Sequence, residues 1–114
     1  MRICFTGGRN YDGLALVGFV IDLLNSVRRD VEINVGDCPT GLDRTIRELD
    51  RKHRFWSAYW DRYGKAAGPI RNRQMLEGGG TIADLLISFP GGAGTEDCVE
   101  QAIKLGIQVL RVPF

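Results

Sequence analysis

The feature that most constrains this chain is the segment from Ala83 to Glu96, which reads A-D-L-L-I-S-F-P-G-G-A-G-T-E. An apolar run ends at Phe89, a proline and three glycines follow within five residues, and a polar, helix-favouring segment begins at Thr95. The segment therefore predicts a strand, a tight turn and a helix start. Glycines let the backbone approach a ligand closely, and the free N–H groups of a first helical turn attract a phosphate. A plain turn that needs positive φ is the alternative, but several glycines exceed what a turn alone requires.

Short apolar runs alternate with helix-like segments along the whole chain. We expect strands at 2–6, 31–35, 54–58, 83–89 and 107–112, helices at 12–28, 42–53, 68–77 and 95–105, and a loop with a turn of helix at 60–67. The runs Leu85 to Phe89 and Gln108 to Val112 are continuously apolar, which is typical of parallel strands buried on both faces. The sequence predicts one α/β domain over residues 1–114, a Rossmann-like doubly wound parallel sheet of about five strands with helices on both faces.

Charge and cysteine content narrow the functional classes. Lysine plus arginine (15) nearly balance aspartate plus glutamate (14), so the chain has no overall positive charge that would bind nucleic acid or an anionic membrane non-specifically. The three cysteines lack metal or disulfide spacing, and His53 stands among charged residues on a solvated helix end. No apolar run approaches transmembrane length, and the first strand reaches turn residues too soon for a signal peptide. We expect a cytoplasmic protein without metal or cofactor.

Three glycine-containing turns fall at the carboxyl ends of predicted strands: Gly7-Gly8-Arg9, Gly36-Asp37 and the turn from Gly91 to Thr95. In a doubly wound sheet these ends share one edge, and ligands bind where the strand order reverses. Arg9 could enter the crevice from the first turn, and Arg71 and Arg73 could enter from the helix at 68–77, because guanidinium groups suit bidentate phosphate recognition. For each arginine alone, a solvated surface charge is the alternative.

Several polar and aromatic side chains near these turns admit two interpretations. Asp37 could accept hydrogen bonds from ribose hydroxyls, or it could form a local Asx turn ahead of Pro39 and Gly41. Asp43 is expected to complement the dipole of its helix. Further along the chain, the aromatic rings of Trp60 and Tyr63 could stack on a base or pack in the core.

The predicted helix at 12–28 carries more apolar residues than one sheet-facing side needs. One stripe runs through Leu14, Val17, Ile21, Leu24 and Val27, and a second runs through Leu16, Phe19 and Leu23. The excess is explained either by packing against a second copy, giving a homodimer or higher homo-oligomer, or by a neighbouring helix of the same chain. Both interpretations stay open.

With these residues in view, the chain resembles the SLOG superfamily, the Rossmann-like group that includes the Lonely Guy (LOG) enzymes, and in particular its compact YspA/YpsA-related branch of bacteria and phages. The matching segments are T-G-G-R-N-Y at Thr6 to Tyr11, G-D-C-P-T-G-L-D at Gly36 to Asp43, W-D-R-Y-G-K-A-A-G-P-I-R-N-R-Q-M at Trp60 to Met75, and F-P-G-G-A-G-T at Phe89 to Thr95. They spread over nearly the whole chain, and the last two are specific in combination.

The resemblance implies a nucleotide-type ligand held by the P-G-G-x-G-T turn. The ligand-binding residues it implies, together with the turns above, are Gly7, Gly8, Arg9, Gly36, Asp37, Arg71, Asn72, Pro90, Gly91, Gly92, Gly94 and Thr95. In the hydrolytic LOG enzymes an arginine of an R-x-x-x-M segment works with a glutamate three residues beyond the threonine. Arg71 and Met75 match that segment, whereas the glutamate position is Cys98 here.

Helical geometry does not supply the missing carboxylate. Glu96 and Glu100 each lie about 200° from Cys98 around the helix, and Asp97 lies about 100° away. Cys98 itself, without a paired histidine, fits a small packing residue better than a nucleophile. The sequence therefore favours a nucleotide-binding module, a sensor or sequestering protein for a nucleoside phosphate or an ADP-ribose-like nucleotide.

Two other functions remain as hypotheses. One is a phosphoribohydrolase or related N-glycosidase that uses Arg71 with Glu96 or Asp97. The other is a structural or partner-binding subunit built on the helix at 12–28.

Overall fold

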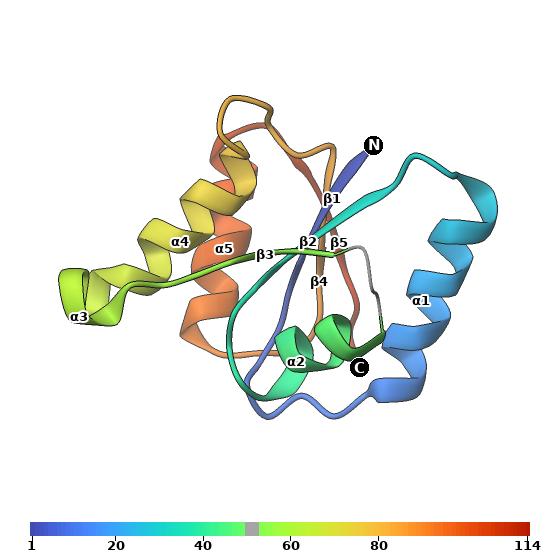
Figure 1. Ribbon diagram of the computed structural model, residues 1–114, viewed down its shortest axis with the longest axis horizontal. Coiled ribbons are helices and arrows are strands. Elements are labelled where there is room, and N and C mark those ends of the chain that lie inside the picture. Colours follow the sequence, from blue (N-terminus) through green and yellow to red (C-terminus); the bar gives the residue numbers. More distant parts are fainter. Residues whose placement is uncertain (50–52) are drawn as a thin grey trace.

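A computed structural model describes residues 1–49 and 53–114 of the chain. The described residues form an all-parallel five-stranded sheet in the order β3-β2-β1-β4-β5 (Figure 1). The strands are β1 (Arg2–Thr6), β2 (Glu32–Gly36), β3 (Arg54–Trp56), β4 (Leu85–Ser88) and β5 (Gln108–Arg111). The predicted α/β class, strand number and parallel sheet are confirmed.

The helices fall between the strands as the sequence predicts, with small shifts at their ends. They are α1 (Leu14–Val27), α2 (Gly41–Leu49), α3 (Trp60–Tyr63) with a 3-10 turn at Gly64–Ala66, α4 (Ala67–Glu77) and α5 (Ala93–Lys104). Residues 50–52 of the predicted helix at 42–53 lie outside the described residues, and His53 precedes β3 in non-helical backbone, half-buried with its ring 6.2 Å from that of Phe55. The expectation of a solvated helix end for His53 was therefore wrong.

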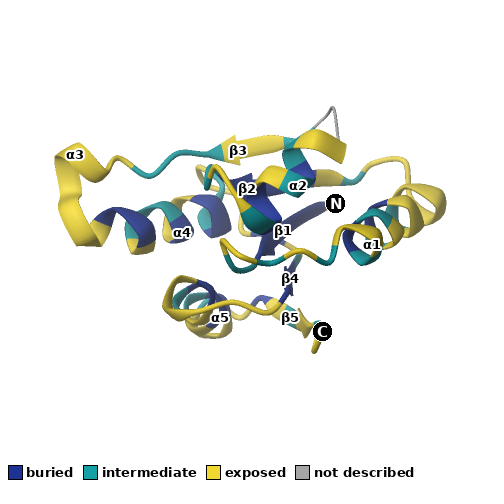
Figure 2. Ribbon diagram, turned by 90° about the horizontal axis from the view of Figure 1, so that it is seen from below, coloured by how far each residue is buried: buried dark blue, intermediate teal, exposed yellow. Residues whose placement is uncertain are grey.

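The sheet separates two apolar clusters, one on each face. On one face, α1 and α2 cover β1, β2 and β4, with Val17, Ile21, Leu42 and Ile46 as their buried contacts. On the other face, α4 and α5 contribute Met75, Leu76, Val99 and Ala102. Figure 2 shows α4 and α5 on the opposite side of the sheet from α1. The doubly wound arrangement fixes which strand ends can meet a ligand.

The strand order reverses between β1 and β4, which are neighbours in the sheet although two strands separate them in the chain. In open α/β sheets the crevice outside the carboxyl ends of such a strand pair is the usual ligand site. Here those ends lead into Gly7-Gly8 and into the turn that begins at Pro90. The feature that organises the sequence thus lies at the switch point of the fold.

The last strand corrects one expectation. β4 is buried as predicted, but β5 is an edge strand whose residues are half-buried or exposed, with Leu110 53% exposed. Continuous apolar character suggested burial on both faces, yet α5 covers only the inner part of β5, and nothing within the described residues pairs with its outer edge. The polar Gln108 and the charged Arg111 in this run were a sequence signal of an edge strand that the prediction did not weigh.

Neither apolar stripe of helix α1 is buried along its whole length, because Leu14 and Val27 of the first stripe are exposed and Leu16 of the second packs partly against the core. Val17 and Ile21 are fully buried and Leu24 packs partly against the core, whereas Phe19, Leu23 and Val27 are exposed. No other helix of the described residues covers these three side chains. The described residues also contain no helix long and apolar enough to cross a membrane.

Candidate functional site

The turns after β1 and β4 touch each other directly. The Gly8 N–H donates a 2.9 Å hydrogen bond to the Pro90 carbonyl oxygen. A Cβ atom added to Gly8 would lie 3.0 Å from the Gly91 Cα and 3.1 Å from the Pro90 oxygen. The absence of a side chain at Gly8 therefore allows this contact, and the predicted convergence of these two turns is confirmed.

The turn before α2 joins the same cluster. The Leu42 N–H donates to the Gly8 carbonyl oxygen at 3.2 Å. Gly41 has φ +68°, and a Cβ there would lie only 2.2 Å from that oxygen. Two independent reasons therefore require glycine at position 41: its left-handed backbone conformation and its close approach to the Gly8 oxygen. We did not assign Gly41 to the site from the sequence, where it had only a role in an Asx turn.

Helix α5 begins with an open N-terminus at this cluster. It starts at Ala93, two residues before the predicted start, and no side chain caps it at Gly92. A Cβ on Gly91 would lie 2.1 Å from Oγ1 of the buried Thr95, so Gly91 and Thr95 pack against each other. A Cβ on Gly92 or Gly94 would meet no atom within 4 Å. These two glycines leave space above the first-turn N–H groups, which have no partner inside a helix.

The two remaining glycines of the predicted site serve packing. A Cβ on Gly7 would lie 2.7 Å from Cδ2 of Leu42, so the core of the α2 face excludes any side chain there. A Cβ on Gly36 would lie 2.5 Å from Nη1 of Arg71, so Gly36 makes room for that guanidinium. The structure therefore gives both glycines a role in positioning neighbouring groups.

Arg71 is held in a polar network on α4. Its Nη1 donates to Oδ1 of Asp37 at 3.1 Å and lies 3.5 Å from the Trp56 carbonyl oxygen, and its Nε donates to Oδ1 of Asn72 at 3.1 Å. The Arg71 side chain is 15% exposed. Its Nη2 makes no hydrogen bond with residues 1–49 or 53–114 and is the free donor of this guanidinium.

Asn72 extends the network to α5. The Asn72 side chain is buried, and its Nδ2 donates to the Gly94 carbonyl oxygen at 3.2 Å and to Oδ2 of Asp97 at 3.0 Å. Oδ2 of Asp97 also accepts a 2.8 Å hydrogen bond from Gln101. Asn72 therefore anchors the start of α5 to α4. It also links Asp97 to Arg71 through two hydrogen bonds, although Asp97 does not contact Arg71 directly.

Asp37 makes contacts with residues distant in the chain, whereas Asp43 lies in the first turn of α2, as the sequence predicts. Oδ1 of Asp37 accepts from Arg71 and, at 3.3 Å, from the Ala58 N–H, both distant in the chain, so Asp37 forms no local Asx turn. Asp43 instead accepts the nearby Cys38 N–H at 3.1 Å. Burial raises the pKa of the Asp43 carboxyl, against the opposing effects of the Cys38 N–H and Arg71. The first-turn position of Asp43 is confirmed, whereas its burial was not recognisable from the sequence.

Of the three acidic residues on α5, only Asp97 is hydrogen-bonded to Asn72, whereas Glu96 and Glu100 are exposed. Glu96 forms a bidentate ion pair with Arg111 on β5, at 3.0 and 2.9 Å, and is exposed away from Arg71. Cys98 is fully buried among core residues, and burial raises the pKa of its thiol to about 12. The structure supports the interpretation of Cys98 as a packing residue.

The other sequence candidates lie outside the cluster. Arg73 is exposed and pairs with Glu77 at 2.8 Å, one turn further along α4. Trp60 and Tyr63 are exposed on α3, and Trp60 approaches Gly68 rather than the turns. Arg9 is exposed beside the turns and makes no side-chain hydrogen bond within the described part of the chain. Of the predicted arginines, Arg9 and Arg71 therefore lie at the site.

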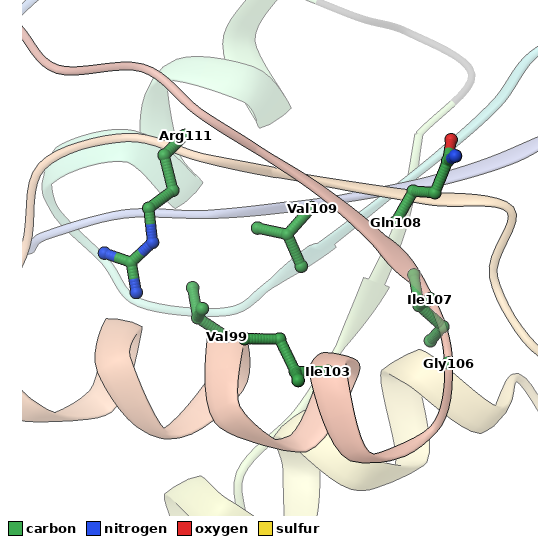
Figure 3. A pocket seen from close by; sticks show the side chains of 7 residues that line it. All are labelled: Val99, Ile103, Gly106, Ile107, Gln108, Val109 and Arg111. Carbon is green, nitrogen blue, oxygen red and sulfur yellow. The ribbon is translucent and has the colours of Figure 1, made fainter.

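Two hollows lie away from the glycine turns. One, of about 460 Å³, runs between α5 and β5 and is lined mainly by apolar side chains (Figure 3). The other, of about 750 Å³, lies between β3 and α4 and is lined by Arg54, Trp56, Tyr59 and Gln74, among others. Neither includes a residue of the three turns. Among residues 1–49 and 53–114, no group of three or more His, Cys, Asp or Glu could hold a metal ion.

Comparison with known proteins gives a partial relative. No family model matches the chain. A stretch of 55 residues, 46% of the chain, is 42% identical to the Gene 61 protein of Mycobacterium phage D29. The match covers 42% of that phage protein, so the chain spans less than half of its length. The name of this relative states no activity.

Proposed function

We propose that the protein binds a nucleotide or a nucleotide-derived ligand, such as a nucleoside phosphate or an ADP-ribose-like nucleotide, and acts as a sensor or sequestering module. The observation that carries the proposal is the open space over Gly92 and Gly94 at the uncapped start of α5, beside the switch point of the sheet. This is also the ligand class that the SLOG resemblance implies.

The phosphate would occupy the space above the first turn of α5. The N–H groups of that turn and the positive end of the helix dipole favour an anion, and a helix of 12 residues carries a full dipole. Arg9 follows Gly8, which is hydrogen-bonded to the Pro90 turn, so the exposed Arg9 side chain starts from the same cluster of turns. A charge-assisted contact from Arg9 would add to phosphate affinity.

The sugar would lie toward the end of β2. Oδ2 of Asp37 accepts no hydrogen bond from the described residues, so it is available to a ribose hydroxyl. Nη2 of Arg71 is the matching free donor. Asp37, Asp43 and Asp97 surround Arg71, so the local charge around Arg71 favours hydroxyl groups over a second phosphate.

A substitution at Gly92 tests the proposal most cleanly. In Gly92→Asp the new side chain enters open space, and aspartate is a favourable N-cap, so we expect the Tm to be retained or raised. The new carboxylate occupies the phosphate position, so affinity for a nucleoside monophosphate should fall at least about 100-fold. Isothermal titration calorimetry against a panel of nucleotides measures both affinity and ligand choice.

Gly92→Asn is the matched control, because asparagine has the same shape and capping ability without the charge. We expect it to lose less affinity than Gly92→Asp by at least about tenfold. Two results would contradict the proposal: a wild-type protein that binds no nucleotide in the panel, or an Asp variant that binds as well as the wild type.

Hydrolysis of the ligand is a second proposed function, and it depends on Asp97. Asp97 is linked through Asn72 to Arg71, whereas Glu96 is engaged by Arg111. If the protein is a phosphoribohydrolase, release of free base from nucleoside monophosphates should be abolished by Asp97→Asn and by Arg71→Ala but not by Glu96→Gln. A wild-type protein that binds a nucleotide and releases no base would exclude this function and leave binding intact.

A further inference from the structure

The outer edge of β5 pairs with no strand among residues 1–49 and 53–114. The Val112 N–H donates to the Ser88 carbonyl oxygen of β4 at 2.8 Å. Backbone groups of a strand alternate in direction, so the N–H and C=O groups of Val109 and Arg111 point away from β4. Such an edge is a template for a further strand.

The side chains beside this edge are apolar on both faces of the sheet. Leu110 is 53% exposed on the α1 face. On the α5 face, Val109 lines the hollow with Val99 and Ile103, and Figure 3 shows these side chains between α5 and β5. Ile103 is exposed at the rim of this hollow, and Phe114 is exposed beyond the end of the strand.

The exposed side of α1 faces the same end of the sheet. Gly18 faces α2, with its added Cβ 3.8 Å from Leu49. Phe19, Leu23 and Val27 lie about 100°, 140° and 180° further around the helix. They are therefore turned away from α2. Helix α2 packs toward β2, which lies on the other side of β1 from β4 and β5, so these side chains are turned toward the β5 end of the sheet. The hydroxyl of Tyr11, just before α1, also donates to the Phe114 carbonyl oxygen at 3.2 Å, which joins the two regions.

We infer that two copies of this chain join along β5, antiparallel and about a twofold axis at Leu110, to form one continuous ten-stranded sheet. Leu110 then faces its own copy in a non-hydrogen-bonded pair. The outward backbone groups of Val109 in each copy pair with those of Arg111 in the other copy. On one face of the joined sheet, α1 packs near α1 of the second copy. On the other face, Ile103 packs near Ile103 of the second copy.

Charge favours this pairing. Arg111 is the one charged residue of β5, and in this register it opposes Val109 of the second copy, so no like charges lie directly opposite each other. Its guanidinium is already neutralised by Glu96 of its own chain. Helix α1 likewise has a single charged residue, Asp22, in 14 positions, and its exposed stripe carries none.

The exposed area is of the size that a dimer requires. At roughly 100 Å² each, the six exposed apolar side chains supply about 600 Å² per copy. They are Phe19, Leu23, Val27, Ile103, Leu110 and Phe114. With the paired backbone, the total approaches the roughly 800 Å² per partner of a typical stable interface. The opposite edge of the sheet, β3, has only three residues and begins with an exposed arginine, which disfavours edge pairing there.

Matched charge insertions at the two sheet edges test the inference. Leu110 and Phe55 are exposed to nearly the same extent, 53% and 56%, on β5 and β3. By sedimentation velocity we expect the wild type to be a dimer, Leu110→Lys to weaken dimerisation at least about tenfold, and Phe55→Lys to remain a dimer. A wild type that stays monomeric, or a Leu110→Lys variant that dimerises like the wild type, would overturn the inference.

A cross-link tests the register. In a non-hydrogen-bonded antiparallel pair the Cα atoms are about 4.5 Å apart, within the range of a disulfide. In a Cys38→Ser background, Leu110→Cys should form a covalent dimer under mild oxidation, whereas Phe55→Cys should not. If Leu23→Lys dissociates the dimer and Leu110→Cys fails to cross-link, the interface lies on α1 alone and the β5 pairing is wrong.

Discussion

At the scale of single residues, the glycines of the P-G-G-x-G-T turn differ in what requires them. Gly91 is fixed by its contact with Thr95, because any side chain there would collide with the threonine hydroxyl. Gly92 and Gly94 have no such contact, and neither has a left-handed φ. Under the proposed function, a ligand would occupy the space that these two glycines leave open.

The buried cysteines give a prediction at the same scale. Burial raises the pKa of both Cys4 and Cys98 to about 12, so both thiols stay protonated in the folded protein at pH 8. We expect an alkylating reagent at pH 8 to modify Cys38 alone in the native protein and all three cysteines after unfolding. Mass spectrometry of the intact protein counts the modifications.

The raised pKa values also predict how stability changes with pH. In the unfolded chain a cysteine ionises near pH 8.5, roughly, while the folded thiols keep their protons up to about pH 12. The folded state therefore loses relative stability as the pH rises through this window. The Tm should fall less steeply between pH 8.5 and 10.5, roughly, in Cys98→Ala than in the wild type. Equal slopes would contradict the assignment of a buried thiol to Cys98.

At the scale of elements, the three turns form one unit because glycines allow their backbones to touch. Gly41→Ala would place a methyl group 2.2 Å from the Gly8 oxygen and force a side chain into φ +68°. We expect a loss of at least about 2 kcal/mol of unfolding free energy, measured by urea denaturation.

Gly94→Ala is the control within the same site. Its methyl group meets open space in the first turn of α5, so the substitution should stabilise the fold by about 0.5–1 kcal/mol. If the space above Gly94 belongs to the ligand, the same variant should bind nucleotide more weakly than the wild type. If Gly94→Ala is more stable than the wild type and binds nucleotide equally well, the space above Gly94 is filled by solvent and not by the ligand.

How far the sequence predicts each element depends on whether local or long-range contacts determine it. Strands β1 and β4 and the glycine ends of α4 and α5 were recognisable, because apolar runs and helix-ending glycines act locally. The edge position of β5 was missed although Gln108 and Arg111 signalled it, since exposure also depends on which strand lies beside it. The role of Arg2 was missed because its contacts are long-range.

Arg2 shows this long-range effect clearly. Its buried guanidinium donates to the Leu76 and Thr81 carbonyl oxygens at 3.3 Å each, to the Met75 carbonyl oxygen, and to Asn34 at 3.2 Å. It thereby satisfies the carbonyl groups at the end of α4, which lack partners within the helix. Nothing near position 2 in the sequence indicates these partners.

At the scale of the whole molecule, the predicted fold places the predicted site. Once the strand order reverses between β1 and β4, the first and fourth strand ends must share an edge, and the convergence of Gly8 with Pro90 follows. The polar network from Asp37 to Asp97 could not be predicted, because it depends on how α4 packs against α5. The sequence thus predicted the glycine turn after β4 better than the side chains around it.

An NMR titration tests the central claim most directly. The chain has 114 residues, so the amide resonances of isotopically labelled protein can be followed one by one while a nucleoside monophosphate is added. We predict the largest shifts at Gly8, Arg9 and the residues from Gly91 to Thr95, with smaller shifts near Asp37. Absence of shifts with every nucleotide tried, or shifts confined to the hollow beside β3 or to the β5 edge, would contradict a nucleotide site at the switch point.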